Sequence, residues 1–499
     1  MARKKGSGKK KNSGEKKKNP IDFSSDDLSD EYDRDYRPPP QKAFNRKKDK
    51  GKQPTNRGAS IKGKGMKRKY EEDEEAGYKS SKTARKYQEG KRLDEEEDYI
   101  PLDGPSTSTA LSTTTNQEVK NLEEPKLFVF FCYPWMASLL DEPTRNKLFG
   151  RDCSLHAADW FHEEVKSLVQ YLTPTPVEIK LREYLVHRVK IALQRRWNTA
   201  RISVFGSFST GMYLPNSDID LVVQFDPEVG AVKQWAVADA LKKAKICSHT
   251  EVISRAKVPV IKLRDLMTDI KVDIVINAPS GLESSRKIIA MLRSQPALKP
   301  LSLIIKHYLA LRQLNEVFTG GLGGYAIICL VYSFLQRHPL VGSGAIDPME
   351  NLSVLLIQFF ELYGSKFNLD KVGIDVRREG SYFERYNNQS HSYFAIRDPN
   401  DIDNDLGIKS HKTEKVVEAF QFAFTALTSK MFAFEEELSR NNYRQLKERT
   451  LSNPMDASIL SRILCIPPDF LKHRDLSKEV YDQKRWKGQK EAESFDFDA

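Results

Sequence analysis

Apolar residues recur every three or four positions after residue 155, a spacing that predicts helices. A first helix is expected from His156 to Tyr171, ending before the Pro174-Thr175-Pro176 break, and a second from Pro176 to Trp197. Their apolar stripes are Phe161, Val165, Leu168 and Val169 in the first helix, and Leu185, Val189, Ala192 and Leu193 in the second. A third helix is expected from Val232 to Lys245.

Between the second and third helices the apolar period falls to two, which is typical of β-strands. One strand is expected to end at Gly206 and Ser207, followed by a short turn and a second strand. In that second strand Asp218 and Asp220 share one face, while the residues that alternate with them point into a core. Two carboxylates held side by side repel each other unless a cation lies between them. The pattern favours a ligand site, with a solvated surface turn as the simpler alternative.

A third carboxylate comes from the strand expected over Asp269–Ile276, which follows another over Val258–Leu263. Asp273 lies on the face opposite the apolar residues Ile270, Val272, Ile274 and Ile276. An edge strand with a solvated carboxylate would explain Asp273 alone. Three converging carboxylates, however, can hold two Mg²⁺ ions, one activating an attacking hydroxyl and one on the leaving phosphates. Asp273 would also help to draw off the hydroxyl proton.

Other residues suit a nucleotide. Gly206 allows the backbone to approach a ligand, and Ser207 can offer its amide and hydroxyl to a phosphate oxygen. Lys306 lies on an apolar helix, where a triphosphate would compensate its charge; an ammonium that reaches the surface is the alternative. Tyr325 begins a helix after a glycine-rich turn and can stack on a base, or it is a buried core tyrosine.

Composition sets the class of protein. The chain has 499 residues, a net charge of +11 at pH 7 and a pI near 9.1, which allows two packed domains plus tails and indicates a polyanionic partner. Five scattered cysteines without metal-binding spacing are expected to be reduced thiols of an intracellular protein. No apolar run reaches membrane length, and the lysine-rich N-terminus predicts no signal peptide.

Residues 1–124 are expected to be a disordered charged tail, because lysine runs, acidic blocks and a proline cluster leave too little apolar surface for a core. Basic clusters such as Lys67-Arg68-Lys69 predict import into the nucleus, with the nucleolus as one destination there. A solvated tail without a receptor is the alternative.

The arrangement Gly-Ser…Asp-x-Asp…Asp resembles the DNA polymerase β-like nucleotidyltransferase superfamily. Further segments resemble the Trf-type nuclear poly(A) polymerases, the adenylating subunits of TRAMP-like RNA surveillance complexes. These segments are residues 306–315, 319–330, 347–364 and 396–404. The similarity covers roughly residues 135–431 and neither tail.

The resemblance implies an α/β (α+β) fold, in which a polymerase β-like nucleotidyltransferase domain with a mixed sheet and a mainly helical central domain form a cleft for ATP. It implies that Asp218, Asp220 and Asp273 bind Mg²⁺ or Mn²⁺ as adenylate is added to RNA 3′ ends. The implied nucleotide contacts are Gly206, Ser207, Ser280, Gly281, Lys306, Gly324, Tyr325, Asp401 and Asn404. The implied partners are a zinc-knuckle RNA-binding protein and an RNA helicase.

Three positions bear on nucleotide choice. Ser280 stands where relatives usually carry asparagine, and Asp405 stands where asparagine is frequent. Asn404 falls where uridylyl-adding relatives commonly have histidine, which favours adenine. The leading hypothesis is therefore a template-independent RNA 3′-end adenylyltransferase. A terminal uridylyl or mixed-nucleotide transferase and a non-catalytic RNA-tethering scaffold are the alternatives.

The expected catalytic domain is residues 175–284, and the helical central (poly(A) polymerase-associated) domain joins residues 125–174 to residues 285–431. Residues 432–499 are expected to form a C-terminal tail with short helices, near 444–449 and 459–464, before a polar end.

Overall fold

The structure is a computed structural model that describes residues 133–139, 156–256, 258–385, 392–440, 448 and 454–497. These residues all belong to one compact unit, residues 117–499. The expected N-terminal tail and most of the expected helix at 444–449 lie outside the described residues. None of the described helices combines the length and the apolar character that a membrane crossing requires.

A five-stranded mixed sheet has the strand order β1-β2-β5-β4-β3. The β2–β5 pair is parallel, and the β1–β2, β4–β5 and β3–β4 pairs are antiparallel. The strands are β1 (Arg201–Phe205), β2 (Ile219–Gln224), β3 (Thr250–Ile253), β4 (Val260–Arg264) and β5 (Lys271–Ile276). The predicted strands are confirmed. The additional strand β3 has only four residues, too few for an alternating pattern to be recognised in the sequence.

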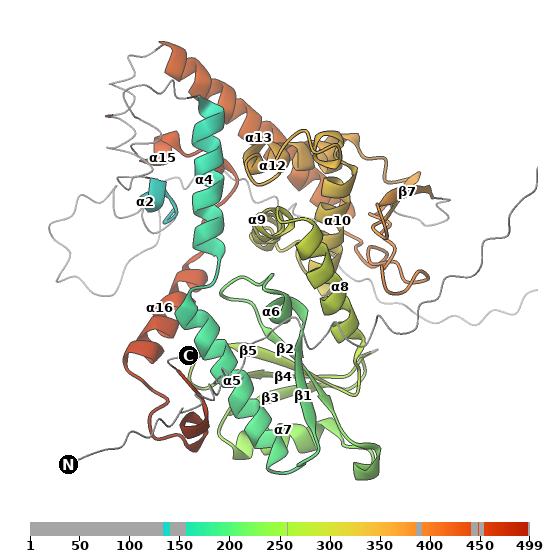
Figure 1. Ribbon diagram of the computed structural model, residues 1–499, viewed down its shortest axis with the longest axis vertical. Coiled ribbons are helices and arrows are strands. Elements are labelled where there is room, and N and C mark those ends of the chain that lie inside the picture. The colour runs from blue at the N-terminus through green and yellow to red at the C-terminus, as the bar shows by residue number, and fades with distance from the viewer. Residues whose placement is uncertain are drawn as a thin grey trace, which may run out of the picture. The chain divides into compact units, whose positions relative to one another are not determined.

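Two helices, α5 (Pro176–Gln194) and α7 (Gln234–Lys243), pack on one face of this sheet (Figure 1). Helix α5 begins with a capping box: Glu178 N–H donates to the Thr175 hydroxyl, and Thr175 N–H donates to the Glu178 carboxylate. The shared core contains Leu185, Val189, Ile219, Leu221, Val223, Val237, Leu241, Val272 and Ile274. Because these residues alternate along the strands, their neighbours, including the predicted aspartates, lie on the other face.

The second and larger core is helical. Its elements are α2 (Met136–Leu139), α4 (Ala157–Leu172), α8 (Ser280–Ser294), α9 (Leu298–Ala310), α10 (Gly324–Arg337), α11 (Pro339–Gly342), α12 (Leu352–Glu361) and α13 (Thr413–Arg440). The short turn η3 (Val317–Thr319), the π-helical turn η4 (Leu362–Lys366) and the hairpin β6 (Val372–Asp375)–β7 (Ser381–Glu384) complete this part of the chain. The short turn η2 (Pro227–Val229) lies in the sheet part, between β2 and α7. Helix α4 matches the first predicted helix to within a residue at each end. The predicted domain boundaries stay a prediction.

The C-terminal segment contains α15 (Pro454–Ala457), η5 (Leu460–Arg462), α16 (Pro468–Asp482) and η6 (Lys490–Ser494). The prediction of a polar end is wrong, because Phe495 and Phe497 pack around the buried ring of Tyr184 on α5. Helix α16 is longer than the short helices predicted. Its buried face, Phe470, Ser477 and Val480, contains a serine and therefore shows no continuous apolar stripe.

Candidate active site

The predicted carboxylates lie on the open face of the sheet. Asp220 on β2 and Asp273 on β5 are register partners in the parallel pair, and such strands run about 4.8 Å apart. Asp218 directly precedes β2 and lies close enough to raise the pKa of both other carboxyls. The fold thus brings Asp273 to Asp218 and Asp220, although Asp218 and Asp273 are 55 residues apart in the sequence.

Burial and neighbouring charges raise the pKa of two of the three carboxyls, Asp220 and Asp273. Burial, with the neighbouring charges of Asp218 and Asp273, raises the pKa of Asp220 to about 7. Burial also raises the pKa of Asp273, although an ion pair with the Lys262 ammonium opposes this shift. Lys262 lies on β4 directly opposite Asp273 in the register. The Lys262 ammonium therefore partly neutralises the negative charge of the three carboxylates.

A divalent metal fits this donor set. Carboxylate oxygens are the ligands that Mg²⁺ prefers, and a divalent cation would relieve the repulsion that, together with burial, raises the pKa of Asp220. In their present positions, no three His, Cys, Asp or Glu side chains among the described residues form a group that could hold a metal ion. Lys262 pairs with Asp273 through Oδ2, so this ammonium and a bound ion would share the Asp273 carboxylate.

Gly206 follows β1 and opens a one-turn helix, α6 (Gly206–Thr210), where the sequence predicts only a turn. Its backbone is left-handed, with φ +68°, and a Cβ here would lie 2.1 Å from Asp220 Oδ2. Its amide donates to the Ser285 hydroxyl of α8 over 2.9 Å. The position thus requires glycine so that Asp220 can lie directly beside the turn. Ser207 is the second residue of α6, and its role at a phosphate stays a prediction.

Lys306 on α9 points inward. Its ammonium donates to the Met212 carbonyl over 2.7 Å, just after α6. Burial lowers the pKa of Lys306 to about 8, although the charges of Asp218 and Asp220 oppose this shift. The alternative of an ammonium that reaches the surface is therefore wrong. A Cβ on Gly324 would lie 3.8 Å from Lys306 Nζ, so the start of α10 adjoins the same site.

Tyr325 on α10 is half-buried and joined to the 398–404 loop. Its hydroxyl donates to Asp398 Oδ1 over 3.4 Å and accepts from Asn400 Nδ2 over 3.3 Å. The buried carboxylate of Asp398 also accepts from Asn404 Nδ2 over 2.9 Å. Asp398 therefore holds Tyr325 and Asn404 in one network, and the Asn404 amide already has a partner within the protein.

The remaining residues predicted to contact the nucleotide are Ser280, Gly281 and Asp401, and they lie in different surroundings. Ser280 is exposed at the start of α8, and a Cβ on the adjacent Gly281 would lie 2.3 Å from the Phe205 ring. Gly281 thus permits close packing of α8 on the end of β1. Asp401 is exposed and accepts from the Asp403 amide in a turn. Their contacts with a nucleotide stay predictions.

Two residues that position the site, Lys262 and Arg182, were not predicted, and Asp398 was expected only as part of the 396–404 segment. Arg182 is buried and donates to the carbonyls of Pro215 (2.7 Å) and Ser217 (2.6 Å), fixing the segment that carries Asp218. A signal existed for Arg182, because it stands three and seven residues before Leu185 and Val189 on the apolar face of α5. Lys262 alternates with apolar residues in β4, which places it on the face of the carboxylates.

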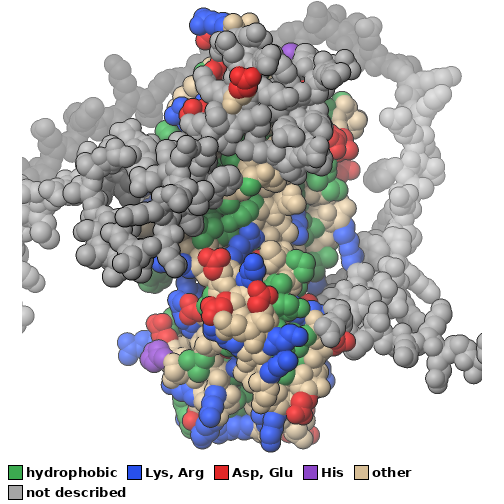
Figure 2. Space-filling view, turned by 90° about the vertical axis from the view of Figure 1, so that its left-hand side faces the viewer, with side chains coloured by type: hydrophobic (Ala, Val, Ile, Leu, Met, Phe, Trp, Pro, Cys, Tyr) green, Lys and Arg blue, Asp and Glu red, His purple; other side chains and the backbone are tan. Residues whose placement is uncertain are grey.

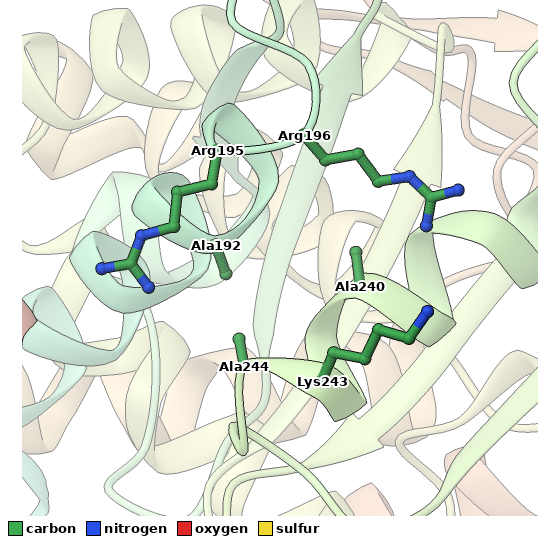
Figure 3. A pocket seen from close by; sticks show the side chains of 6 residues that line it. All are labelled: Ala192, Arg195, Arg196, Ala240, Lys243 and Ala244. Atoms are coloured by element: carbon green, nitrogen blue, oxygen red, sulfur yellow. The ribbon is translucent and has the colours of Figure 1, made fainter.

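A hollow of about 250 Å³ lies on the helical side of the sheet, between α5 and α7. It is lined by Ala192, Arg195, Arg196, Ala240, Lys243 and Ala244. In Figure 3 the two guanidinium groups point to opposite sides while the alanine methyls line the space between them. Arg195 pairs with Glu491 and Lys243 with Asp239, each over 2.8 Å. The positive charge is therefore not gathered on a common ligand position.

A second hollow, of about 400 Å³, is formed by α4, α12 and α13. Its lining is His156, Ala157, Ala158, Ile357, Thr428, Met431, Phe432 and Glu435. Neither hollow includes a predicted carboxylate, so the predicted ATP cleft stays a prediction.

Comparisons with known proteins agree with this geometry. Residues 161–293 match the family model "Poly(A) RNA polymerase, mitochondrial-like, central palm domain", and residues 351–404 match "Cid1 family poly A polymerase". The solved polymerase core of TRAMP, an RNA surveillance complex, is 34% identical. It aligns with a TM-score of 0.57 over 66% of this chain and 99% of that chain.

Curated relatives give the same result. Poly(A) RNA polymerase cid14 of Schizosaccharomyces pombe is 40% identical over 64% of this chain and 47% of its own length. Poly(A) RNA polymerase protein 1 of Saccharomyces cerevisiae is 35% identical over 71% of this chain and 54% of its own length. The inactive non-canonical poly(A) RNA polymerase protein Trf4-2 of Drosophila melanogaster is 33% identical over 54% of this chain and 68% of its own length. The chain spans about half the length of the first two relatives.

The mixed sheet, its paired carboxylates and the helical core define a nucleotidyltransferase fold of the DNA polymerase β-like class. Within that class, the chain belongs to the Trf-type family of poly(A) RNA polymerases, as the resemblance of its motifs predicts.

Proposed function

We propose that the protein is a template-independent RNA 3′-end adenylyltransferase that uses ATP and two divalent metal ions, Mg²⁺ or Mn²⁺. The observation that carries this proposal is the direct pairing of Asp220 with Asp273 on parallel strands, with Asp218 beside them. Family membership supports it, since the named relatives include poly(A) RNA polymerases.

The residues divide the chemistry between them. Asp218, Asp220 and Asp273 would hold the ions, which when bound activate the attacking hydroxyl and neutralise the leaving phosphates. Lys306 presents its ammonium beside the carboxylates, where it compensates the charge of a triphosphate. The Asp273 carboxylate, which pairs with Lys262 through Oδ2, accepts the proton of the RNA 3′ hydroxyl.

The other side of the site supports adenine as the base. Tyr325 offers a half-buried ring for stacking, with its hydroxyl fixed by Asp398. Asn404, bonded to the same carboxylate, presents an amide where a histidine would favour uracil. Ser280 and Asp405 depart from the family pattern, and the comparison of single NTPs measures how strict the preference for ATP is.

The test is addition of nucleotides to a labelled RNA by the purified chain with Mg²⁺ or Mn²⁺ and each NTP alone. Extension with ATP that exceeds extension with the other NTPs supports the proposal, and the Asp220→Asn variant should give none. Preference for UTP, or equal use of several NTPs, would favour the uridylyl or mixed-nucleotide alternative. No extension with ATP, with or without a basic RNA-binding partner, would remove the adenylyltransferase.

One relative carries the name inactive, so membership of the family does not by itself guarantee catalysis. A non-catalytic RNA-tethering scaffold is therefore the second candidate. A scaffold has no need of three mutually repelling acids. The double change Asp218→Ala with Asp220→Ala separates the two candidates, because a scaffold keeps its cellular role while an adenylyltransferase loses extension and stays folded.

We place this activity in nuclear RNA surveillance and decay, with a zinc-knuckle RNA-binding protein and an RNA helicase as partners. The solved TRAMP polymerase core supports this setting, and the basic clusters within residues 1–124 support import. A fluorescent fusion of the chain should concentrate in the nucleus, and deletion of residues 1–124 should disperse it. Co-purification of an RNA helicase with the tagged chain tests the assembly.

A further inference from the structure

The loop between α9 and α10 is held on both sides. Within it, the Gly321 amide donates to the Glu316 carbonyl over 2.8 Å, and the Leu322 amide to the Leu314 carbonyl over 2.9 Å. From outside, the Lys412 amide donates to the Gly320 carbonyl over 2.9 Å. The turn η3 within this loop is therefore fixed by backbone hydrogen bonds.

Phe318 stands at the middle of η3 and is 97% exposed, the highest value for a large apolar side chain among the described residues. Its neighbour Val317 packs inward, since a Cβ on Gly323 would lie 2.8 Å from Val317 Cγ2. Single exposed apolar side chains are common on protein surfaces and need no special role. Phe318 differs because a fixed turn presents its ring to solvent in the loop that joins α9, which carries Lys306, to α10, which carries Tyr325.

Both ends of the loop that carries Phe318 lie near the charged residues of the site. Glu316 lies within electrostatic reach of Asp218, Lys262, Lys271 and Lys306, and burial together with Asp218 raises its pKa. At the other end, Gly324 adjoins Lys306. Phe318, two residues beyond Glu316, thus belongs to a loop whose two ends adjoin the charged site.

The neighbouring sheet surface supplies positive charge. Lys271 is exposed on β5, two residues before Asp273 and on the same face. It lies opposite Arg264 in the register, and the Arg264 guanidinium pairs with Asp269. Lysine side chains bind the phosphates of a nucleic-acid backbone, and unpaired bases stack on exposed aromatic rings. Figure 2 shows one face of the molecule, on which Lys and Arg side chains are interspersed with Asp and Glu side chains.

We propose that Phe318 is a stacking platform for a base of single-stranded RNA near its 3′ end, with Lys271 contacting an adjacent phosphate. The platform holds the strand independently of its sequence, because every base offers a flat face. This inference rests on the proposed function, since it assigns a binding role to the RNA that the enzyme would extend.

The test measures binding of a labelled 15-nucleotide oligoadenylate to the full chain by fluorescence anisotropy, without ATP or metal. Phe318→Ala should weaken binding roughly 5- to 100-fold, and Phe318→Trp should restore it to within about twofold, since tryptophan also stacks. Phe432→Ala is the matched control, because Phe432 is 76% exposed on α13 and lines the separate hollow there. It should bind as the wild type does.

A second RNA, abasic at one of its last three positions, identifies the stacked base. The RNA that lacks the stacked base should bind the wild type more weakly than the intact RNA does. Phe318→Ala should bind this abasic RNA and the intact RNA equally well, because the stacking contact is already lost. The inference would be overturned if the wild type and Phe318→Ala bound RNA equally well, or if Phe432→Ala weakened binding as much as Phe318→Ala does. It would also be overturned if the losses from Phe318→Ala and from the abasic position were additive for every abasic RNA. If the wild type adds no nucleotide yet binds RNA through Phe318, the proposed function fails and the RNA site stands. If it extends RNA and Phe318→Ala leaves the KM for RNA unchanged, only the platform fails.

Discussion

Replacement of Gly206 by alanine tests whether the Gly-Ser turn exists to accommodate Asp220. Alanine at φ +68° costs about 1–2 kcal/mol of stability, because its Cβ crowds the backbone in the left-handed region. The new Cβ would also lie 2.1 Å from Asp220 Oδ2, where real Cβ atoms keep at least 3.0 Å. Asp220 must therefore retreat by roughly 1 Å, and a displacement of that size in a catalytic group can cost about 100-fold in rate.

Gly211→Ala is the matched control. Gly211 has φ +66°, almost the same conformation, but a Cβ there meets only Lys299 Nζ at 3.5 Å, an ordinary contact. Both variants should therefore lose about 1–2 kcal/mol of unfolding free energy from backbone strain. Only Gly206→Ala should also lose activity through Asp220.

Urea unfolding of the metal-free chain measures the strain, and single-turnover addition of adenylate at saturating ATP and RNA measures the rate. Titration with Mn²⁺ shows whether the displaced carboxylate also weakens metal binding. Should Gly206→Ala add adenylate within about threefold of the Gly211→Ala rate, where roughly 100-fold is expected, the argument from close approach to Asp220 would be refuted.

Three further outcomes follow from the structure. The Asp218→Ala, Asp220→Ala double variant should show little loss of metal-free melting temperature, because it removes a buried carboxyl and the repulsion that together raise the pKa of Asp220; a large fall would contradict the repulsion argument. Burial lowers the pKa of His307 to about 4, so the folded protein keeps this ring neutral while the unfolded chain protonates it near pH 6.5. Stability should therefore fall by up to about 1.4 kcal/mol per unit as pH drops from 6.5 towards 4, and His307→Gln, which keeps a donor for its carbonyl partner, should show a shallower slope in urea titrations. Asn404→His should raise the ratio of UTP to ATP incorporation in competition assays, and an unchanged ratio would remove this residue from base selection.

Much of the site follows from local patterns. The alternation in β2 and β5 places Asp220 and Asp273 opposite their apolar neighbours, and the structure confirms that assignment. Lys306 could be assigned to an apolar helix, but its direction could not, because both an inward and an outward ammonium fit the same spacing. Only the contact with the Met212 carbonyl decides between them.

Other features had no readable signal. The requirement for glycine at 206 depends on a carboxylate 14 residues away that the fold brings beside it. The pairing of Lys262 with Asp273 depends on β4 lying next to β5, which the strand order alone determines. Helix α16 escaped prediction because the serine on its buried face interrupts the apolar spacing.

By itself, the amino-acid sequence determined the strands that carry Asp220 and Asp273, the face on which these two carboxylates lie and the family to which the chain belongs. These properties follow from backbone periods of two and 3.6 residues and from short motifs, both of which are local. The tertiary structure alone decided which strands are neighbours, which residues face each other in register and which cation meets the third carboxylate. Such pairings join distant segments, and they are set by the packing of the whole core rather than by any single stretch of chain.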